Sequence, residues 1–279
     1  DNSLKVFDQY KDNPHVSCLV VNETNSGSPF KQWMKGILLA QGMYIWIAEA
    51  DDLAESDFLE KTVGLAERHE DFAFCYAGSL LIDSDGGIMR NRDVNKWGRR
   101  ARKQAAYFEG RQFAARNLYW KNYVINASGV LFRRQYALNL AESDFIRMRC
   151  CGDWLFWFQM ALQGGVGMIY RNLNYFRQHT AKVTVASTRS GESIREGLQV
   201  VQKMEKELPL LKEYKKRLCR GRFYRRIKRS SLSEECKEEL FDELSAVLGG
   251  TEADYRLERL NQFLCVLNPF ILTPGRDRL

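Results

Sequence analysis

The sequence lacks several features that would narrow its class. It has no run of about 18 apolar residues, so we expect no helix that spans a membrane. Its seven Cys include no Cys-x-x-Cys pair, which argues against a zinc site and favours free thiols in a reducing compartment. The visible chain also has no signal-peptide pattern and no glycine-rich phosphate loop near its start. These absences together predict a cytoplasmic protein without structural disulfides.

The length and charge of the chain give broader bounds. With 279 residues, of which 45% are hydrophobic, it can bury one large core or two small ones. The net charge is +7, and the basic excess is concentrated at 96–103 and 212–229. The first residue is Asp1 rather than Met, so we expect the chain to begin inside a longer protein.

Short apolar strands alternate with amphipathic helices in the first part of the chain. Parallel strands covered by helices on both faces have this pattern, and their ligands bind beyond the carboxyl ends of the strands. The predicted strands are 16–21, 43–49 and 72–83, and the predicted helices are 3–12, 31–42 and 57–70. The fold class is therefore α/β.

The second part of the chain changes character near residue 186. Before it, we predict a strand at 129–132, an apolar helix at 151–165 and an edge strand at 166–179. After it, the sequence is charged and largely helical. We therefore expect a domain at 1–186 and a helical region at 187–279.

The stretch "YIWIAEADD" (44–52) joins an apolar strand to three carboxylates, those of Glu49, Asp51 and Asp52. Carboxylates grouped at a strand end can bind a hard divalent cation such as Mg²⁺ through oxygen. The alternative interpretation is that Asp51 or Asp52 begins the next helix, because Asp favours a helix N-terminus.

The longer phrase "NSGSPFKQWMKGILLAQGMYIWIAEADD" (25–52) resembles the family 2 glycosyltransferases of the GT-A fold. In that family a mixed, mostly parallel sheet carries an acidic motif that holds a metal and the diphosphate of a nucleotide sugar. The resemblance covers roughly residues 1–185. It implies that the chain lacks the N-terminal strand–helix–strand of the family, and that its cofactor is Mn²⁺ or Mg²⁺.

The resemblance implies specific roles on the donor side. Glu49 stands at the first acidic position and Asp51 at the last, which predicts Asp51 as a metal ligand. Glu49 and Asp52 would face the donor diphosphate. In "YFRQH" (175–179), His179 would reach the metal and Arg177 would offset phosphate charge.

The acceptor side is implied by two further motifs. Asp153 in "CGDWLFW" (151–157) matches the position of the general base of the family, and its alternative role is to cap the helix. Trp154 would stack on a sugar of the acceptor, whereas we expect Trp157 to pack in the core. Ser128, in the loop before strand 129–132, would line the acceptor site.

The basic segment 211–229 has three possible interpretations. It is a salt-bridged helix packed on the catalytic domain, a surface that touches anionic lipid at the inner face of a membrane, or a nucleic-acid site. No recognition motif supports nucleic acid, so we expect none as a partner.

These observations predict an inverting, metal-dependent glycosyltransferase of polysaccharide biosynthesis. It would move a sugar from a nucleoside-diphosphate sugar to a hydroxyl of a glycan or lipid-linked acceptor. Two other hypotheses remain open: a non-catalytic binding module, and a metal-dependent nucleotidyltransferase.

Overall fold

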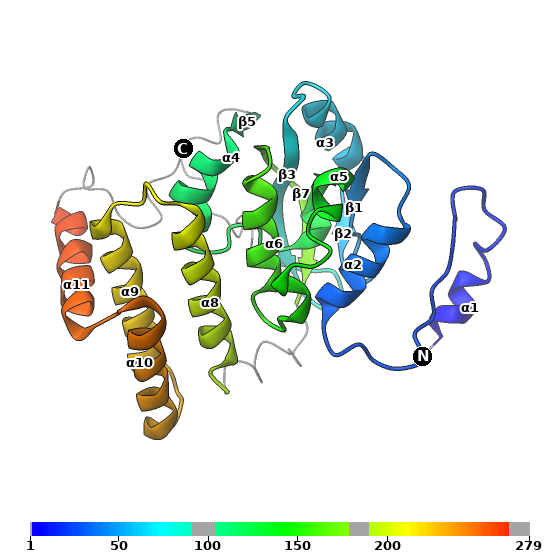
Figure 1. Ribbon diagram of the computed structural model, residues 1–279. Helices are drawn as coiled ribbons and strands as arrows, with labels where there is room; N and C mark the ends of the chain where they lie inside the picture. Colours follow the sequence, from blue (N-terminus) through cyan, green and yellow to red (C-terminus); the bar gives the residue numbers. More distant parts are fainter. Residues whose placement is uncertain (1, 91–103, 179–189, 268–279) are drawn as a thin grey trace.

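The computed structural model describes residues 2–90, 104–178 and 190–267. A seven-stranded sheet forms its centre, in the order β1-β6-β3-β7-β2, with β4 paired to β3 and β5 paired to β7 (Figure 1). The strands are β1 (Tyr44–Trp46), β2 (Leu53–Ala54), β3 (Phe72–Ile82), β4 (Ile88–Arg90), β5 (Ala105–Phe108), β6 (Val130–Arg133) and β7 (Gly165–Arg177). The helices are α1 (Ser3–Phe7), α2 (Pro29–Leu39), α3 (Phe58–Ala66), α4 (Gly110–Phe113), α5 (Arg134–Leu138), α6 (Gly152–Ala161), α8 (Glu192–Glu207), α9 (Glu213–Lys228), α10 (Glu234–Leu248) and α11 (Glu252–Leu267). Short turns of helix are η2 (Ala114–Leu118), η3 (Ala127–Gly129) and η4 (Asp144–Arg147).

Strand direction determines where the functional residues gather. β3 and β7 are parallel, with Ile82 beside Arg177 at their carboxyl ends. β6 is antiparallel to both β1 and β3, so β1 runs in the same direction as β3 and β7. The carboxyl ends of these three strands and the start of β6 therefore meet at one edge of the sheet, which we call the carboxyl edge.

The prediction of a mixed sheet with flanking helices is confirmed, but the sheet is less parallel than predicted. In the part of the chain that the structure describes, β3–β7 is the parallel pair, and the other pairs are antiparallel. Parallel pairing needs a long crossover connection, whereas β3 reaches β4 through the short turn 83–87, which permits only an antiparallel hairpin.

The central strand β3 is buried along almost its whole length because helices cover both of its faces. Phe74 and Tyr76 point to a large core that includes α2 and α6. Cys75 and Ala77 point to the opposite face, where they join a smaller core with α3. This alternation follows from the two-residue period of a strand.

Two strand predictions are wrong. Residues 16–21 form no strand, and Leu19, Val20 and Val21 are exposed. A strand needs a neighbouring strand to pair its backbone groups, and the described residues place none beside this segment. β7 is an interior strand rather than an edge strand, because it pairs with β3 on one side and with β2 and β5 on the other.

The C-terminal helices pack on the same core as the sheet. α8 contacts α6, and α9 lies between α8 and α11 (Figure 1). Basic residues of α9 pair with carboxylates of its neighbours, as in Arg217–Asp254 at 2.7 Å. Close packing at Gly221 fixes α9 against α11, because a Cβ there would lie 2.3 Å from the carbonyl oxygen of Asp254. These contacts support the interpretation of 211–229 as a salt-bridged, packed helix.

Some predictions fall outside the described residues. These are the boundary near 186, the basic segment 96–103 and His179. Among the described helices, none has the length and apolar character needed to cross a membrane.

Candidate active site

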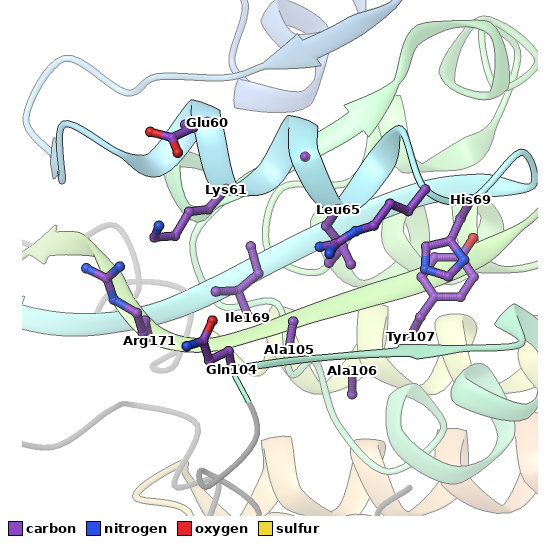
Figure 2. Close-up of a pocket in the computed structure, with 12 residues that line it drawn as sticks. Glu60, Lys61, Leu65, His69, Gln104, Ala105, Ala106, Tyr107, Ile169 and Arg171 are labelled. Carbon is purple, nitrogen blue, oxygen red and sulfur yellow. The ribbon is translucent and has the colours of Figure 1, made fainter.

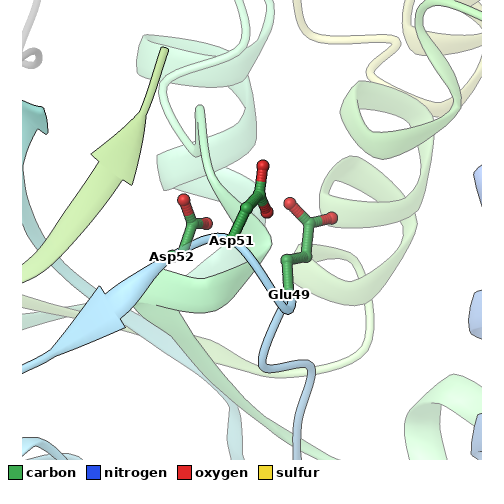
Figure 3. Close-up of side chains that lie close together, drawn as sticks. All are labelled: Glu49, Asp51 and Asp52. Carbon is green, nitrogen blue, oxygen red and sulfur yellow. The ribbon is translucent and has the colours of Figure 1, made fainter. Parts of the chain in front are cut away.

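Three carboxylates lie together in the loop between β1 and β2, at the carboxyl edge. Ligand oxygens of Glu49, Asp51 and Asp52, which we call the acidic cluster, all lie within 4.8 Å of one another. Figure 3 shows the three side chains pointing to the same side of the loop. Asp51 is exposed and Asp52 is partly buried. Burial, followed by the charges of Asp52 and Asp51, raises the pKa of Glu49 to about 7.

Hydrogen bonds to the loop before β6 hold the acidic cluster in place. The indole Nε1 of Trp46 donates to the backbone oxygen of Ser128 at 2.8 Å. The backbone N–H of Glu49 donates to Ser128 Oγ at 3.0 Å. Ser128 is only 2% exposed, so it lies beneath the acidic loop. Its hydroxyl therefore supports the loop that carries Glu49.

Asp52 connects this loop to β7 and to the start of β6. Its Oδ2 accepts a hydrogen bond from the side-chain amide of Asn126 at 2.8 Å, and its Oδ1 accepts one from the backbone N–H of Arg177 at 2.9 Å. The same Asn126 amide donates to Asn174 Oδ1 at 2.9 Å, and Asn174 is fully buried. Both donors to Asp52 are neutral groups, so its charge is oriented but not cancelled by them.

The guanidinium of Arg177 binds backbone carbonyl groups. Nε donates to the carbonyl of Asp51 at 2.6 Å, and Nη1 donates to the carbonyls of Asp83 and Ser84 at 2.8 and 2.9 Å. These bonds join the acidic loop to the turn after β3. The structure thus brings Arg177 to the acidic cluster, with its side chain engaged in holding the loop.

Asp153 lies in the first turn of α6 with both carboxylate oxygens bonded. Oδ2 accepts from the amide of Asn122 at 2.7 Å, and Oδ1 accepts from the backbone N–H of Trp154 at 2.7 Å. Burial raises the pKa of Asp153 to about 7, although both hydrogen bonds lower it. The charge of Glu49 contributes to the rise, which brings Asp153 into the electrostatic field of the acidic cluster.

The loop before Asp153 is fixed by a buried carboxylate of α8. Glu196 accepts three backbone N–H groups, from Arg149 at 2.7 Å, Cys150 at 2.8 Å and Cys151 at 2.7 Å. Gly152 then lets the chain pass close to α2, because a Cβ there would lie 2.4 Å from the ring of Phe30. Asp153 is therefore held by the C-terminal helices as well as by its own helix.

The two tryptophans of α6 have different environments. Trp157 is fully buried, as predicted for a core residue. Trp154 is 7% exposed, its indole donates to the carbonyl of Leu118 at 2.7 Å, and it lines a pocket between α6, α8 and α9. Its ring therefore has little free face, although its edge lies at a pocket wall.

Another pocket, of about 770 Å³, involves different elements and none of the predicted site residues. It is formed by α3, β5 and β7 (Figure 2). There the ring of His69 stacks on Tyr107 with 3.5 Å between centroids, and the Tyr107 hydroxyl donates to Asp71 at 2.9 Å. Arg171 pairs with Asp57 at 2.9 Å. These partners give His69, Tyr107 and Arg171 a structural role.

Sequence reasoning missed Asn122 and Glu196, which contact Asp153 and the loop before it. Neither lies in a motif, and each comes from a distant part of the chain: Asn122 is 31 residues from Asp153, and Glu196 is 45 residues from Cys151.

A helix-flanked mixed sheet with carboxylates at its carboxyl edge defines the GT-A class of fold. A family model described as glycosyl transferase family 2 matches residues 1–140, half of the chain. The chain belongs to glycosyl transferase family 2. No curated protein matches it.

Solved structures of S. aureus TarS share this fold. TarS 1-349 in complex with UDP-GlcNAc is 14% identical with a TM-score of 0.53, and the match covers 88% of this chain and 59% of that one. S. aureus TarS is 14% identical with a TM-score of 0.54, and the match covers 94% of this chain and 48% of that one. The chain thus spans about half to three-fifths of the TarS chains it matches.

Proposed function

We propose that this chain is an inverting glycosyltransferase that moves a sugar from a nucleoside-diphosphate sugar to a hydroxyl of a glycan or lipid-linked acceptor. The observation that carries the proposal is the carboxylate of Asp153, which the amide of Asn122 holds in the first turn of α6; burial and the charge of Glu49 raise its pKa to about 7. A general base works best when its pKa lies near the working pH. The presence of UDP-GlcNAc in a crystal of S. aureus TarS, which has the same fold, supports a nucleotide sugar as donor.

The residues of the acidic cluster suit a divalent cation. Carboxylate oxygens are the ligands that Mg²⁺ and Mn²⁺ prefer, and those of Glu49, Asp51 and Asp52 lie close enough together to share one ion. Asp51, the most exposed of the three, would be the principal ligand, and His179 remains a predicted one. Such an ion would neutralise the donor diphosphate and stabilise the leaving group.

In the proposed reaction, the acceptor hydroxyl gives its proton to Asp153. Its oxygen forms a bond to the anomeric carbon as the bond from that carbon to the diphosphate breaks. The nucleoside diphosphate leaves with the electron pair. Because the attack comes from the face opposite the leaving group, the anomeric configuration inverts. Asn122 keeps the carboxylate of Asp153 oriented for this transfer.

The remaining predicted residues would support these two centres. Asp52 and Arg177 would fix the acidic loop through the hydrogen bonds described above, and thus set the position of the donor diphosphate. Ser128 would support Glu49 from below, and Trp154 would form part of the wall on the acceptor side. In this proposal the enzyme works in polysaccharide biosynthesis at the inner face of a membrane.

A panel of nucleotide sugars, starting with UDP-GlcNAc, tests the proposal. With Mn²⁺ present, the expected product is a nucleoside diphosphate, detected by a coupled assay. Release of pyrophosphate from a nucleoside triphosphate and a sugar 1-phosphate, without turnover of any nucleotide sugar, would instead identify a nucleotidyltransferase. Binding of a nucleotide sugar without turnover, measured calorimetrically, would identify a non-catalytic module.

Asp51→Ala tests the cation site separately. We expect weaker binding in a Mn²⁺ titration followed by electron paramagnetic resonance, and lower turnover. Asp85→Ala is the control, because Asp85 is exposed in the turn after β3 and lies outside the acidic cluster. Unchanged Mn²⁺ affinity in Asp51→Ala would contradict the assignment.

A further inference from the structure

A pocket of about 780 Å³ lies between the N-terminus of α6, α8 and α9, and Cys151 and Trp154, which flank Asp153 in the chain, are among its lining residues. Asn122 lines it while donating to Asp153, and Trp154, the residue after Asp153, forms part of its wall. A molecule in this pocket would therefore contact residues that bond to the proposed base or adjoin it in the chain. The pocket shares no residue with the acidic cluster.

The lining of this pocket is strongly basic, and no carboxylate contributes to it. Four arginines line it, and we call it the arginine pocket: Arg222, Arg225 and Arg226 of α9, and Arg229 directly after the helix. Arg225 pairs with the buried Glu258 of α11 at 3.2 Å. Across residues 2–90, 104–178 and 190–267, the other three form no ion pair. Positive charge in this pocket is thus only partly balanced by the protein.

The arginines crowd one another. Burial lowers the pKa of Arg225, and the like charges of Arg222, Arg229 and Arg259 lower it further, whereas Glu258 acts in the opposite direction. An anion in the pocket would relieve this repulsion. Guanidinium groups bind phosphate particularly well, because their planar N–H donors match two phosphate oxygens at once.

Two residues that line the pocket, Arg222 and Trp120, each carry a donor atom that is buried from solvent and has no acceptor among the described residues. Within the described part of the chain, Nη1 of Arg222 and Nε1 of Trp120 are buried without a hydrogen-bond partner. The Arg222 guanidinium lies over the Trp120 ring, 5.9 Å from its centroid, which keeps it at the wall. Nη2 of Arg226 donates to Ser193 Oγ at 2.9 Å, which orients a second guanidinium.

From this charge and the position of the pocket, we propose that the arginine pocket binds a phosphate group carried by the acceptor. The inference rests on the proposed function: the phosphate is held by α9 and a hydroxyl of the same molecule reaches Asp153. The donor diphosphate would lie at the acidic cluster, so donor and acceptor anions would bind at separate places. The substrate class is then a phosphorylated sugar, polyol or glycan.

Titration of the whole chain with glycerol 3-phosphate, and with glycerol as the neutral match, tests the pocket without donor or metal. We expect binding of the phosphorylated probe only. Arg222→Gln with Arg226→Gln should weaken it about tenfold or more, as expected for the loss of charge-assisted hydrogen bonds. Arg229→Gln, at an exposed position, should weaken it as well without risk to folding.

Arg256→Gln is the matched control, because it removes one positive charge from an exposed side chain of α11 outside the pocket. Equal binding of the two probes would overturn the proposal, and so would equal weakening by Arg256→Gln. Retention on phosphatidylglycerol vesicles without any binding of glycerol 3-phosphate would overturn it in favour of membrane contact.

The same variants separate this inference from the proposed function. Donor hydrolysis should keep its KM for the nucleotide sugar in Arg229→Gln, while the KM for a phosphorylated acceptor rises. A raised donor KM would assign the pocket to the donor diphosphate and overturn the inference. If wild-type protein turns over no nucleotide sugar, the proposed function fails, whereas the titration still decides the phosphate site.

Discussion

The acidic cluster and the arginine pocket are both linked to Asp153, the cluster through the charge of Glu49 and the pocket through Asn122, yet their charges are held in different ways. The acidic cluster lies on a loop, and neutral donors of Asn126, Ser128 and the backbone fix it. The arginine pocket lies on a long helix whose other side is paired with carboxylates, as in Arg217–Asp254. The carboxylates of the acidic cluster are surrounded by neutral donors, and the arginines that line the pocket are surrounded by like charges. In neither place does an opposite charge among the described residues fully balance these groups.

This contrast separates structural charge from charge available to a ligand. Arg217 and Glu196 have partners within the protein, and they fix helices and loops. Arg222 forms no ion pair with a described residue and faces the like charge of Arg225, and Glu49 faces the like charges of Asp51 and Asp52, so both can bind a ligand of opposite sign. The four predictions below test this distinction, from the largest expected effect to the smallest.

Asp153→Asn should lower turnover by a factor of about 10² to 10⁴, the usual contribution of a general base. Asn keeps the shape, and its single oxygen can still accept from Asn122, whereas its amide nitrogen would face the backbone N–H of Trp154, so we expect some loss of stability but the same fold. Steady-state kinetics with a circular-dichroism melt as the control would check this. Full activity in the variant would mean that Asp153 only caps α6.

Arg225→Gln should lower the free energy of unfolding by about 3 kcal/mol, because it leaves the buried Glu258 without its ion-pair partner. The remaining charges of Arg222 and Arg229 keep the effect at the lower end of the range for buried pairs. Arg229→Gln, exposed and unpaired with any described carboxylate, should change it by less than about 0.5 kcal/mol. Urea unfolding of both variants would measure the two free energies. Equal losses of stability would contradict the distinction between charges paired within the protein and charges available to a ligand.

Glu196→Gln should cost about 1–3 kcal/mol, because the amide nitrogen of Gln would face backbone N–H donors in the loop 149–151. Glu192→Gln is the matched control on the same helix. Its carboxylate pairs with an exposed Arg149 at 3.9 Å, a contact worth at most about 1 kcal/mol. The midpoint temperature of thermal unfolding and the turnover number should both be lower in Glu196→Gln than in the wild-type protein. A loss of stability as large in Glu192→Gln would contradict the assignment.

The pH profile should show the smallest effect. Asp153 accepts a proton only when ionised, so kcat should rise with pH through an inflection near 7 and then level off. Asn122→Ala removes a hydrogen bond that lowers the pKa of Asp153, and the inflection should move to higher pH. Asn139→Ala, which removes an exposed amide, should leave the profile in place. A shift to lower pH in Asn122→Ala would exclude Asp153 as the titrating group.

The sequence predicted an element correctly where the pattern of apolar residues within that element was enough to define it. The strand at 72–83 and the helix at 151–165 are found as Phe72–Ile82 and Gly152–Ala161. The acidic cluster was placed correctly at a carboxyl edge, since strand direction follows from the order of elements. Residues 16–21 have an equally apolar pattern, but a strand depends on a neighbour that periodicity does not report.

Residues of the candidate site could be predicted only where they belong to a sequence motif. Asp153 and the acidic cluster lie in recognisable phrases of the sequence. The guanidinium of Arg177 was expected on phosphate, whereas the fold presents it with three backbone carbonyls that no sequence pattern reveals. The arginine pocket was missed for a related reason: α9 is basic all round, and only packing against α8 and α11 distinguishes its paired residues from those that face the pocket.

The hydrogen bonds of Glu196 have a practical consequence for protein engineering. A recombinant fragment that stops near residue 186 would retain the sheet, the acidic cluster and Asp153, yet the loop 149–151 would lose its three acceptor contacts. Domain swaps among relatives face the same constraint. A helical region grafted from a relative must supply a carboxylate at the position of Glu196, or the loop that leads to Asp153 will lose these contacts.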